Sequence, residues 1–598
     1  MYNYHYAHES KVLNSHDSSK YHQFIRRRLN RPATIPVLIN EGGIPIDGDA
    51  EKAELFNEFF VSNFTTDNGS LPPFPSRVGP STSINFVTFS APSIYTKLSK
   101  LKKSVSINPD TFPAILLQSC AYQLSTPLSI LFSACFNMSE LPTPWLTSTV
   151  IPLFKKGKRC SVSNYRPISL TSSCCKIMES IISDALSHYL LTNNLLSNHQ
   201  HGFIKNRSTL TNLLSSVRLW HSSLNLKKST DIIYIDFAKA FDTVSHPKLI
   251  HKLKSYGILG KLLLWISAWL SGRSQSVKLG KLYSKLLTVL SGVFQGSVLG
   301  PLLFLLFIND LIDIIPPEVH PTLFADDLKI FSDQTPVPNL SDPGYVSSTL
   351  LQNALNSVYS WSLLWQLHIS IPKCTILSIS NAKSPKPRLY FIHSDKLPQV
   401  SSYSDLGVSI DEKLTFSNHI LSITKTAYSK SFLLSRCFLS KNPTLLKSAF
   451  STYVRPILEY ASPIWSPHLD KDIVLLEKVQ RRFSKSIPAY RHLPYAARLQ
   501  CLSLQSLSLR RIHIDLCTCY RIVHGLSSLE SSLFFTRRHS ITRGHPLSLV
   551  KPPVRLNSTK FSFQSRIIDT WNSLPLAVVT AISLSSFKLK LKCINLEG

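Results

Sequence analysis

The chain has 598 residues, with 65 Lys and Arg against 35 Asp and Glu, which gives a net charge of +30 at pH 7. This length exceeds what one compact core serves, so several structural units are expected. The basic surplus repels cations and attracts polyanions, and it therefore indicates nucleic acid as the partner. A membrane surface is disfavoured, because no basic amphipathic helix of sufficient length stands out.

Three further features exclude other classes of protein. The N-terminal segment MYNYHYAHESK lacks the apolar run of a secretory signal, so an intracellular protein is expected. The longest apolar run, VLGPLLFLLFI, ends at Ile308 and is shorter than the ~20 residues that span a bilayer, which predicts a buried core helix. The 11 cysteines lack the spacing of a zinc site, so we expect reduced thiols.

The predicted elements divide the chain into four parts. Residues 1–92 form an N-terminal extension, with a helix in AEKAELFNEFFVSNF and a linker in LPPFPSRVGPSTS. Residues 93–412 alternate strand-like runs such as DIIYIDF with helix-like runs such as KIMESIISDALSHYLL, which predicts a catalytic unit of the α/β or α+β class. Residues 413–500 carry apolar positions three and four apart with basic residues between them, typical of helices that face a polyanion. Residues 501–598 are basic and rich in Leu and Ser, without a predicted fold.

Two segments place aspartates at the ends of predicted strands. In TLFADDLKIF, strand-forming residues flank Asp326 and Asp327, which predicts a hairpin with both carboxylates at its tip. Taken alone, this pattern is more typical of a surface turn, because Asp is a favoured turn residue. In DIIYIDFAKAFDTV, however, a continuous apolar run typical of a strand covered on both faces ends at Asp236. A carboxylate at the mouth of a core is costly without a counter-charge.

The aspartates together predict a metal site. Carboxylates on adjacent strands repel each other unless a cation lies between them, and hard oxygen ligands suit Mg²⁺. Two metal ions ~3.5–4 Å apart would activate a primer 3′-hydroxyl and stabilise the leaving pyrophosphate. We therefore expect Asp236, Asp326 and Asp327 to hold two Mg²⁺ ions, with Mn²⁺ as the alternative.

Longer motifs carry a resemblance to a known family. YIDFAKAFDTVSH, GVFQGSVLGPLLFLLFINDL and FADD, in that order, closely resemble three core motifs of the reverse transcriptases of LINE-type (non-LTR) retrotransposons, of the jockey-like or chicken-repeat-like clades. The resemblance continues through IPLFKKGKRCSVSNYRPISLTSSCCKIMES, HQHGFIKNRSTLTNLL, YSDLGVSIDEKLTFSNHI, YVRPILEYASPIWSP and SRIIDTWNSLP. It implies an α+β right-hand polymerase with fingers and palm in 93–412, a helical thumb in 413–500 and a basic C-terminal region. The motifs of the family's N-terminal endonuclease are not found before residue 90, which implies a polymerase without that domain.

The resemblance also assigns roles to residues of the predicted palm. Asp236 and Asp326 would be the metal ligands, with Asp327 as a less direct third carboxylate. Phe241 stands where the family has its steric gate against a 2′-hydroxyl, and the alternative is a core aromatic residue. Gln295 and Gly296 match the loop of the nucleotide pocket, where a small residue lets the backbone approach and an amide can donate hydrogen bonds.

Basic residues complete the implied site. Arg166, in NYRPI, matches the fingers arginine that clamps the incoming triphosphate, a task suited to its bidentate fork. Lys156 and Lys158 would lie nearby, and the alternative for them is an ordinary solvated loop. Lys373, in ISIPKC, matches a lysine that could protonate the leaving pyrophosphate, although Ser370 or Pro372 stands near where the family often has Asn.

The leading hypothesis is an RNA-directed DNA polymerase of a non-LTR retrotransposon. Its partners would be an RNA template, a DNA primer and target, and deoxynucleoside triphosphates, with an element-encoded RNA-binding protein as a further candidate. Target-primed synthesis implies work in the nucleus, with the protein otherwise cytoplasmic and not bound to a membrane. The alternatives are another palm-fold RNA-templated polymerase and a catalytically unused or domesticated RNA-binding remnant, and the intact carboxylates argue against the latter.

Overall fold

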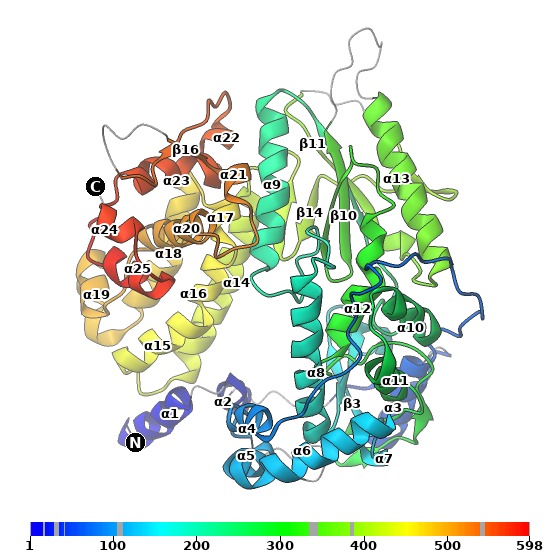
Figure 1. Ribbon diagram of the computed structural model, residues 1–598. Helices are drawn as coiled ribbons and strands as arrows, with labels where there is room; N and C mark the ends of the chain where they lie inside the picture. The colour runs from blue at the N-terminus through cyan, green and yellow to red at the C-terminus, as the bar shows by residue number, and fades with distance from the viewer. Residues whose placement is uncertain are drawn as a thin grey trace.

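A computed structural model describes residues 2–15, 18–28, 35–40, 42–104, 112–333, 345–382, 388–538 and 545–596. Figure 1 shows a body of strands and helices beside a mainly helical portion, drawn in yellow to red, that holds the C-terminal helices. The predicted α+β class is confirmed.

The central sheet has four antiparallel strands in the order β11-β5-β10-β9. These strands are β5 (Thr230–Ile235), β9 (His320–Phe324), β10 (Asp327–Asp333) and β11 (Thr375–Ile379). β5 takes an inner position because its run TDIIYI is rich in β-branched residues, and all six of its residues are buried. The prediction of a strand covered on both faces is thereby confirmed.

Alternate residues of β5 enter two different hydrophobic cores, as the period of a strand requires. Ile233 and Ile235 pack in the core that contains α12 (Gly300–Ile308), the buried apolar helix predicted from the sequence. Ile232 and Tyr234 pack in the core that contains α9 (Thr209–Asn225), which runs alongside the strands in Figure 1. Because both faces are covered, the ends of the strands are held in a fixed register.

The first core draws on many helices. They are α4 (Ala91–Ser99), α5 (Ala114–Ser119), α6 (Ala121–Met138), α7 (Thr143–Leu146), α8 (Ser173–Thr192), α10 (His246–Ser255), α11 (Gly260–Leu270) and α13 (Tyr345–Leu364). Within the ranges that the structure describes, no helix is long and apolar enough to cross a membrane.

A second sheet lies beside the first core. Its strand order is β4-β3-β6-β7, with β8 also paired to β6. The strands are β3 (Thr147–Phe154), β4 (Tyr165–Leu170), β6 (Ser274–Leu279), β7 (Leu282–Tyr283) and β8 (Leu287–Thr288). The predicted N-terminal helix forms as α3 (Asp49–Val61) and packs on this sheet, where the ring of Phe56 meets the ring of Tyr165 edge-on at 4.9 Å.

The tract 71–83, expected as a linker, forms no helix or named strand but is held against the core. Phe74 packs at the edge of the first core. The backbone N–H of Arg77 donates to the carbonyl of Ser255 at 2.7 Å, and its guanidinium pairs with Asp313. These contacts fix the path of the chain between α3 and α4.

A small hairpin is anchored on the central sheet near the ends of β5 and β10. It consists of β14 (Ser402–Asp405) and β15 (Val408–Asp411). Lys329 of β10 donates to Asp405 at 2.6 Å in a buried ion pair, and the rings of Tyr234 and Tyr403 stack at 3.8 Å. These contacts fix the hairpin to the sheet.

The C-terminal helices share the second core with one face of the central sheet. They include α14 (Ser417–Cys437), α15 (Pro443–Tyr453), α16 (Arg455–Glu459), α17 (Ser462–Trp465), α18 (Asp470–Lys485), α19 (Tyr495–Cys501), α20 (Leu507–Val523), α23 (Phe563–Asn572), α24 (Leu576–Val579) and α25 (Leu584–Leu591). The sequence TLLKSAFSTYVRPILEYASPIW, helical in pattern, is divided into α15, α16 and α17. Pro456 and Pro463 explain the breaks, since each lies in the first turn of a new helix, where its missing N–H is tolerated.

Two N-terminal helices, α1 (Tyr2–Asn14) and α2 (Ser18–Arg28), dock on the C-terminal helices. Tyr21 stacks on Tyr453 of α15. The buried carboxylate of Glu9 accepts hydrogen bonds from the backbone N–H groups of Leu439 and Ser440. The start of the chain therefore lies against a segment more than four hundred residues away in sequence.

A buried ion pair ties α10 to the end of α12. The Lys252 ammonium is fully buried, donates to Asp310, and lies 3.6 Å from the ring centre of Trp365. Asp310 also accepts from the indole N–H of Trp361 at 2.9 Å. Burial lowers the pKa of Lys252 to about 8, with Asp310 opposing that shift.

Replacing Asp310 by Asn is expected to lower the free energy of unfolding by about 3 kcal/mol, because the buried Lys252 would lose the counter-ion that offsets its desolvation. Denaturant titrations of the variant and the unaltered protein measure the difference. The matched control is Asp313→Asn, which breaks the more exposed pair with Arg77 and should cost less than about 1 kcal/mol. Equal losses in the two variants would contradict the distinction between the pairs.

Candidate active site

The turn between β9 and β10 presents Asp326. Ala325 and Asp326 form the turn, and Asp327 begins β10 directly opposite Phe324. Ala325 has a φ of 57°, in the left-handed region that residues other than glycine rarely adopt. The predicted hairpin with the two aspartates at its tip is confirmed in these bounds.

Asp236, directly after β5, lies beside this turn. The antiparallel register pairs Leu328 with Ile235, so the adjacent residues Asp327 and Asp236 are neighbours at the ends of β10 and β5. Desolvation raises the pKa of Asp326, and repulsion from Asp236 raises it further. Desolvation, followed by repulsion from Asp326 and Asp236, raises the pKa of Asp327 to about 6. The three carboxylates therefore act on one another as a single electrostatic cluster.

The cluster suits a divalent cation, although the side chains are not arranged around one. In the part of the chain that the structure describes, no three His, Cys, Asp or Glu side chains converge closely enough to hold a metal. One Asp236 oxygen instead accepts from the Lys373 ammonium at 3.0 Å, an ion pair whose lysine is 61% exposed. Hard oxygen donors that repel one another are the chemistry that a divalent cation satisfies.

The β3–β4 hairpin supplies positive charge to the cluster. Arg166 of β4 lies opposite Leu153 of β3, so both side chains lie on the same exposed face. Lys155, two residues beyond Leu153, continues that face by the alternation of a strand. Burial lowers the pKa of Lys155, and the positive charges of Arg166 and Lys373 lower it further. Both Arg166 and Lys155 oppose the rise in the pKa of Asp326, so both are close to it.

Lys155 is a residue that the motifs of the sequence did not single out. Lys156 and Lys158 were the predicted lysines of this loop, and both are exposed in the segment that joins β3 to β4. Lys156 acts on Lys155, whereas Lys155 acts directly on Asp326 and Asp327. The signal that could have found it is the strand alternation, which continues from Leu153 in β3 to Lys155 just beyond the end of the strand.

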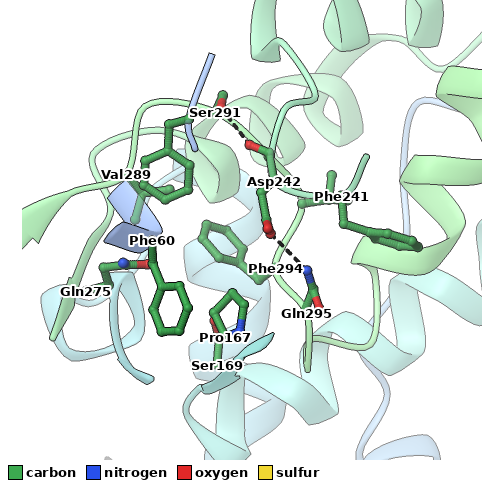
Figure 2. A pocket seen from close by; sticks show the side chains of 13 residues that line it. Phe60, Pro167, Ser169, Phe241, Asp242, Gln275, Val289, Ser291, Phe294 and Gln295 are labelled. Carbon is green, nitrogen blue, oxygen red and sulfur yellow. Dashed lines mark hydrogen bonds between the residues drawn. The ribbon is translucent and has the colours of Figure 1, made fainter. Parts of the chain in front are cut away.

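Phe241 packs against α12. Its ring is half-buried and stacks on the ring of Phe304 at 4.2 Å, with the exposed Phe203 edge-on at 6.2 Å. In Figure 2 the ring points away from the Asp242 carboxylate. The packing suits either a gate or a core aromatic residue, so the gate stays a prediction.

The loop with Gln295 and Gly296 is pinned to β4. The Gln295 carbonyl accepts from the backbone N–H of Ser169 at 2.8 Å. Gly296 has a φ of 125°, and a Cβ there would lie 2.4 Å from the Ser169 carbonyl oxygen. Only glycine allows this approach of the two backbones.

Asp242 is a second residue that the sequence did not single out. Its carboxylate accepts from the Gln295 side-chain amide at 2.9 Å, as Figure 2 shows. Burial raises the pKa of Asp242 to about 6, and the bond from Gln295 opposes the rise. Both side chains line a pocket of about 350 Å³ at the junction of β4 with the loop. The amide expected to face a nucleotide is thus oriented by a buried acid.

These features define a class of protein: an antiparallel sheet with three aspartates at adjoining strand ends, faced by a basic hairpin, is the palm of a nucleic acid polymerase. Residues 154–410 match the family described as reverse transcriptase (RNA-dependent DNA polymerase). The chain therefore carries a reverse transcriptase domain. Reverse transcriptases as a family use divalent metal ions.

Named relatives show a more specific similarity. The chain is 27% identical to the RNA-directed DNA polymerase from mobile element jockey of Drosophila melanogaster, over 60% of this chain and 40% of that protein. It is 28% identical to the probable RNA-directed DNA polymerase from transposon BS of the same species, over 65% of this chain and 43% of that protein. The chain thus spans about two fifths of the length of the curated relatives that it matches. The predicted resemblance to LINE-type reverse transcriptases is confirmed.

Asp242→Asn is expected to raise the free energy of unfolding at pH 7 to 8, while the amide oxygen still accepts from Gln295. The folded pKa of Asp242, about 6, lies above its unfolded value of 3.8, so the carboxyl costs stability as the pH rises through that window. The gain at pH 7 should be on the order of 2–3 kcal/mol. Thermal unfolding of both proteins between pH 4 and pH 8 tests this, and a gain that persisted unchanged at pH 4 would contradict it.

Proposed function

We propose that this chain is an RNA-directed DNA polymerase of a non-LTR retrotransposon, which adds deoxynucleotides to a primer 3′-hydroxyl on an RNA template. The observation that carries the proposal is the cluster of Asp236, Asp326 and Asp327 at adjoining strand ends inside the reverse transcriptase domain. The similarity to polymerases of mobile elements supports the same activity.

Asp236 and Asp326 would bind the metal ions, with Asp327 as the third carboxylate. Two Mg²⁺ ions are the proposed cofactor, with Mn²⁺ as the alternative, since the donors are hard carboxylate oxygens. Such ions lower the pKa of a primer hydroxyl and neutralise the charge that develops on the leaving pyrophosphate. The raised pKa values of Asp326 and Asp327 support this role, because carboxylates that repel each other gain most from a cation.

Arg166 and Lys155 would receive the triphosphate. They lie on one exposed face of the β3–β4 hairpin, close to Asp326. Arginine supplies a bidentate contact and lysine a compact charge. Lys373, which pairs with Asp236, would be released from that contact once a cation binds there, and its ammonium would then be available as the proton donor to pyrophosphate.

The nucleotide sugar and base would meet Phe241 and the Gln295–Gly296 loop. Phe241 would act as the gate against a 2′-hydroxyl, supported by its stacking on Phe304. Asp242 would orient the Gln295 amide, and Gly296 would let the loop stay close to β4. Lys156 and Lys158 are left as flanking charges on the hairpin loop.

The wider assembly follows from the same proposal. Residues 93–412 would form fingers and palm and 413–500 the thumb, with 1–92 and 501–598 packed around them. RNA template, DNA primer and target, and deoxynucleoside triphosphates would be the partners, together with an element-encoded RNA-binding protein. The net charge of +30 supports a polyanionic partner. Target-primed synthesis would take place in the nucleus.

Asp236→Asn is expected to reduce primer extension on an RNA template at least about 1000-fold, since the loss of a metal ligand removes several kcal/mol of transition-state stabilisation. The assay is single-nucleotide incorporation with Mg²⁺, a DNA primer and an RNA template. Asp184→Asn, at an exposed aspartate paired with Lys97, is the control and should keep full activity. Equal rates in Asp236→Asn and the unaltered protein would reject the proposed function.

Lys155→Ala is expected to raise the KM for deoxynucleotides at least about tenfold, because a charged contact to phosphate contributes about 1.5–3 kcal/mol. Lys156→Ala, the neighbouring substitution, should change the KM less than about twofold because its exposed side chain interacts with Lys155 rather than with the carboxylates. Steady-state titrations of nucleotide on one template–primer compare the two. A larger rise in KM for Lys156→Ala would indicate that Lys156, as predicted from the sequence, makes the phosphate contact.

A further inference from the structure

The segment HQHGF, between α8 and α9, runs along the outer edge of β9. The backbone N–H of Leu323 donates to the carbonyl of His199 at 2.9 Å, and the N–H of His201 donates to the carbonyl of Leu323 at 2.9 Å. Gln200 and Leu323 therefore pair in a parallel bridge. This segment therefore lies beside the turn that carries Asp326.

The Gln200 side chain holds the turn residue before Asp326. Its amide oxygen accepts from the backbone N–H of Ala325 at 2.9 Å and from that of Gly202 at 2.8 Å. Its amide nitrogen donates to the carbonyl of Ala325 at 3.1 Å. Gln200 is 2% exposed, so these bonds form away from solvent. One side chain thus binds both polar backbone groups of Ala325.

The conformation that Gln200 holds is a strained one. A left-handed φ at an alanine is unfavourable, because its Cβ crowds the following carbonyl oxygen. The two buried hydrogen bonds from Gln200 to Ala325 offset that strain. The carbonyl of Ala325 belongs to the peptide bond that enters Asp326. Fixing that carbonyl therefore fixes the direction in which the Asp326 side chain leaves the turn.

The surroundings hold Gln200 in turn. A Cβ at Gly202 would lie 2.4 Å from the Ala325 nitrogen, so the segment can approach the turn only with glycine there. The guanidinium of Arg207 donates to the carbonyl of Gln200. The side-chain amide of Asn212 donates to the carbonyl of Leu323 at 2.9 Å.

We infer that Gln200 is a positioning residue, which sets the orientation of Asp326 through the Ala325–Asp326 peptide and so prepares that carboxylate to bind metal. This inference rests on the proposed function, because it takes Asp326 as a metal ligand. The Gln200 side chain bonds backbone groups rather than the carboxylates, so its effect should fall on the chemical step and on the metal requirement.

Gln200→Leu tests the inference, because leucine removes all three hydrogen bonds at similar size. The expected result is a fall of about 10- to 100-fold in the rate of single-nucleotide incorporation, the effect of a misplacement of about 1 Å. The Mg²⁺ concentration for half-maximal rate should rise several-fold. The Kd for template–primer should change less than about twofold. All rates are normalised to the fraction of active enzyme.

The matched control is Gln480→Leu. Gln480 is also fully buried, and its amide donates to the carbonyl of Gln505 at 2.9 Å within the C-terminal helices. This variant should keep the incorporation rate and the Mg²⁺ requirement of the unaltered protein, whatever its thermal stability.

Gln200→Glu provides a second measurement, the pH dependence of the incorporation rate, which a loss of stability alone would not change. An ionised carboxylate can accept from Ala325 and Gly202 but cannot donate to the Ala325 carbonyl, whereas a protonated carboxyl can do both. Burial and the nearby aspartates would raise its pKa. The ratio of its rate to that of the unaltered protein should therefore rise as the pH falls from 8 to 6.

Asp326→Asn separates the possible failures. If Asp326→Asn is inactive while Gln200→Leu keeps the normal rate and Mg²⁺ requirement, the positioning role is overturned and the proposed function stands. A loss in Gln200→Leu that disappears on normalisation, or a flat pH ratio for Gln200→Glu, also overturns it. Full activity in Asp326→Asn would overturn both proposals.

Discussion

The mutual repulsion of three carboxylates is the constraint on which the rest of this structure depends. Asp236, Asp326 and Asp327 lie at adjoining strand ends, and desolvation and repulsion raise the pKa of the latter two. Left to relax, such a cluster would separate. It is held together because β5 and β10 are locked in register and because hydrophobic cores cover both faces of their sheet.

The same repulsion accounts for the positive residues around the cluster. Lys373 pairs with Asp236, and Lys155 and Arg166 lie close enough to oppose the shift in the pKa of Asp326. These cations stand at the open side of the sheet and are exposed, so they can exchange a carboxylate for a phosphate at little cost. The charges that stabilise the site without substrate are therefore the charges that a triphosphate would use.

Local patterns in the sequence predicted the elements that build the site, but not the contacts between them. The apolar run before Asp236 and the paired aspartates are local signals, and both were placed correctly in strand and turn. Lys155 was missed because the basic run offers four cations and only the alternation of β3 selects among them. Gln200 could not have been found, because it binds a residue 125 positions away. Such a contact leaves no periodicity in either segment.

There is a physical reason why the strands and turns could be predicted from the sequence and the long-range contacts could not. Propensity and patterning decide which residues form a strand or a helix, and they act over a few residues. The strained conformation of Ala325 is not favoured by its own sequence, since alanine disfavours a positive φ. It persists because the hydrogen bonds from Gln200 and the pairing of β9 with β10 hold Ala325 in this conformation. The position of the Asp326 carboxylate is therefore a property of the assembled fold. The three aspartates can be recognised in the sequence, but the geometry of their site also depends on the buried amide of Gln200 from another segment.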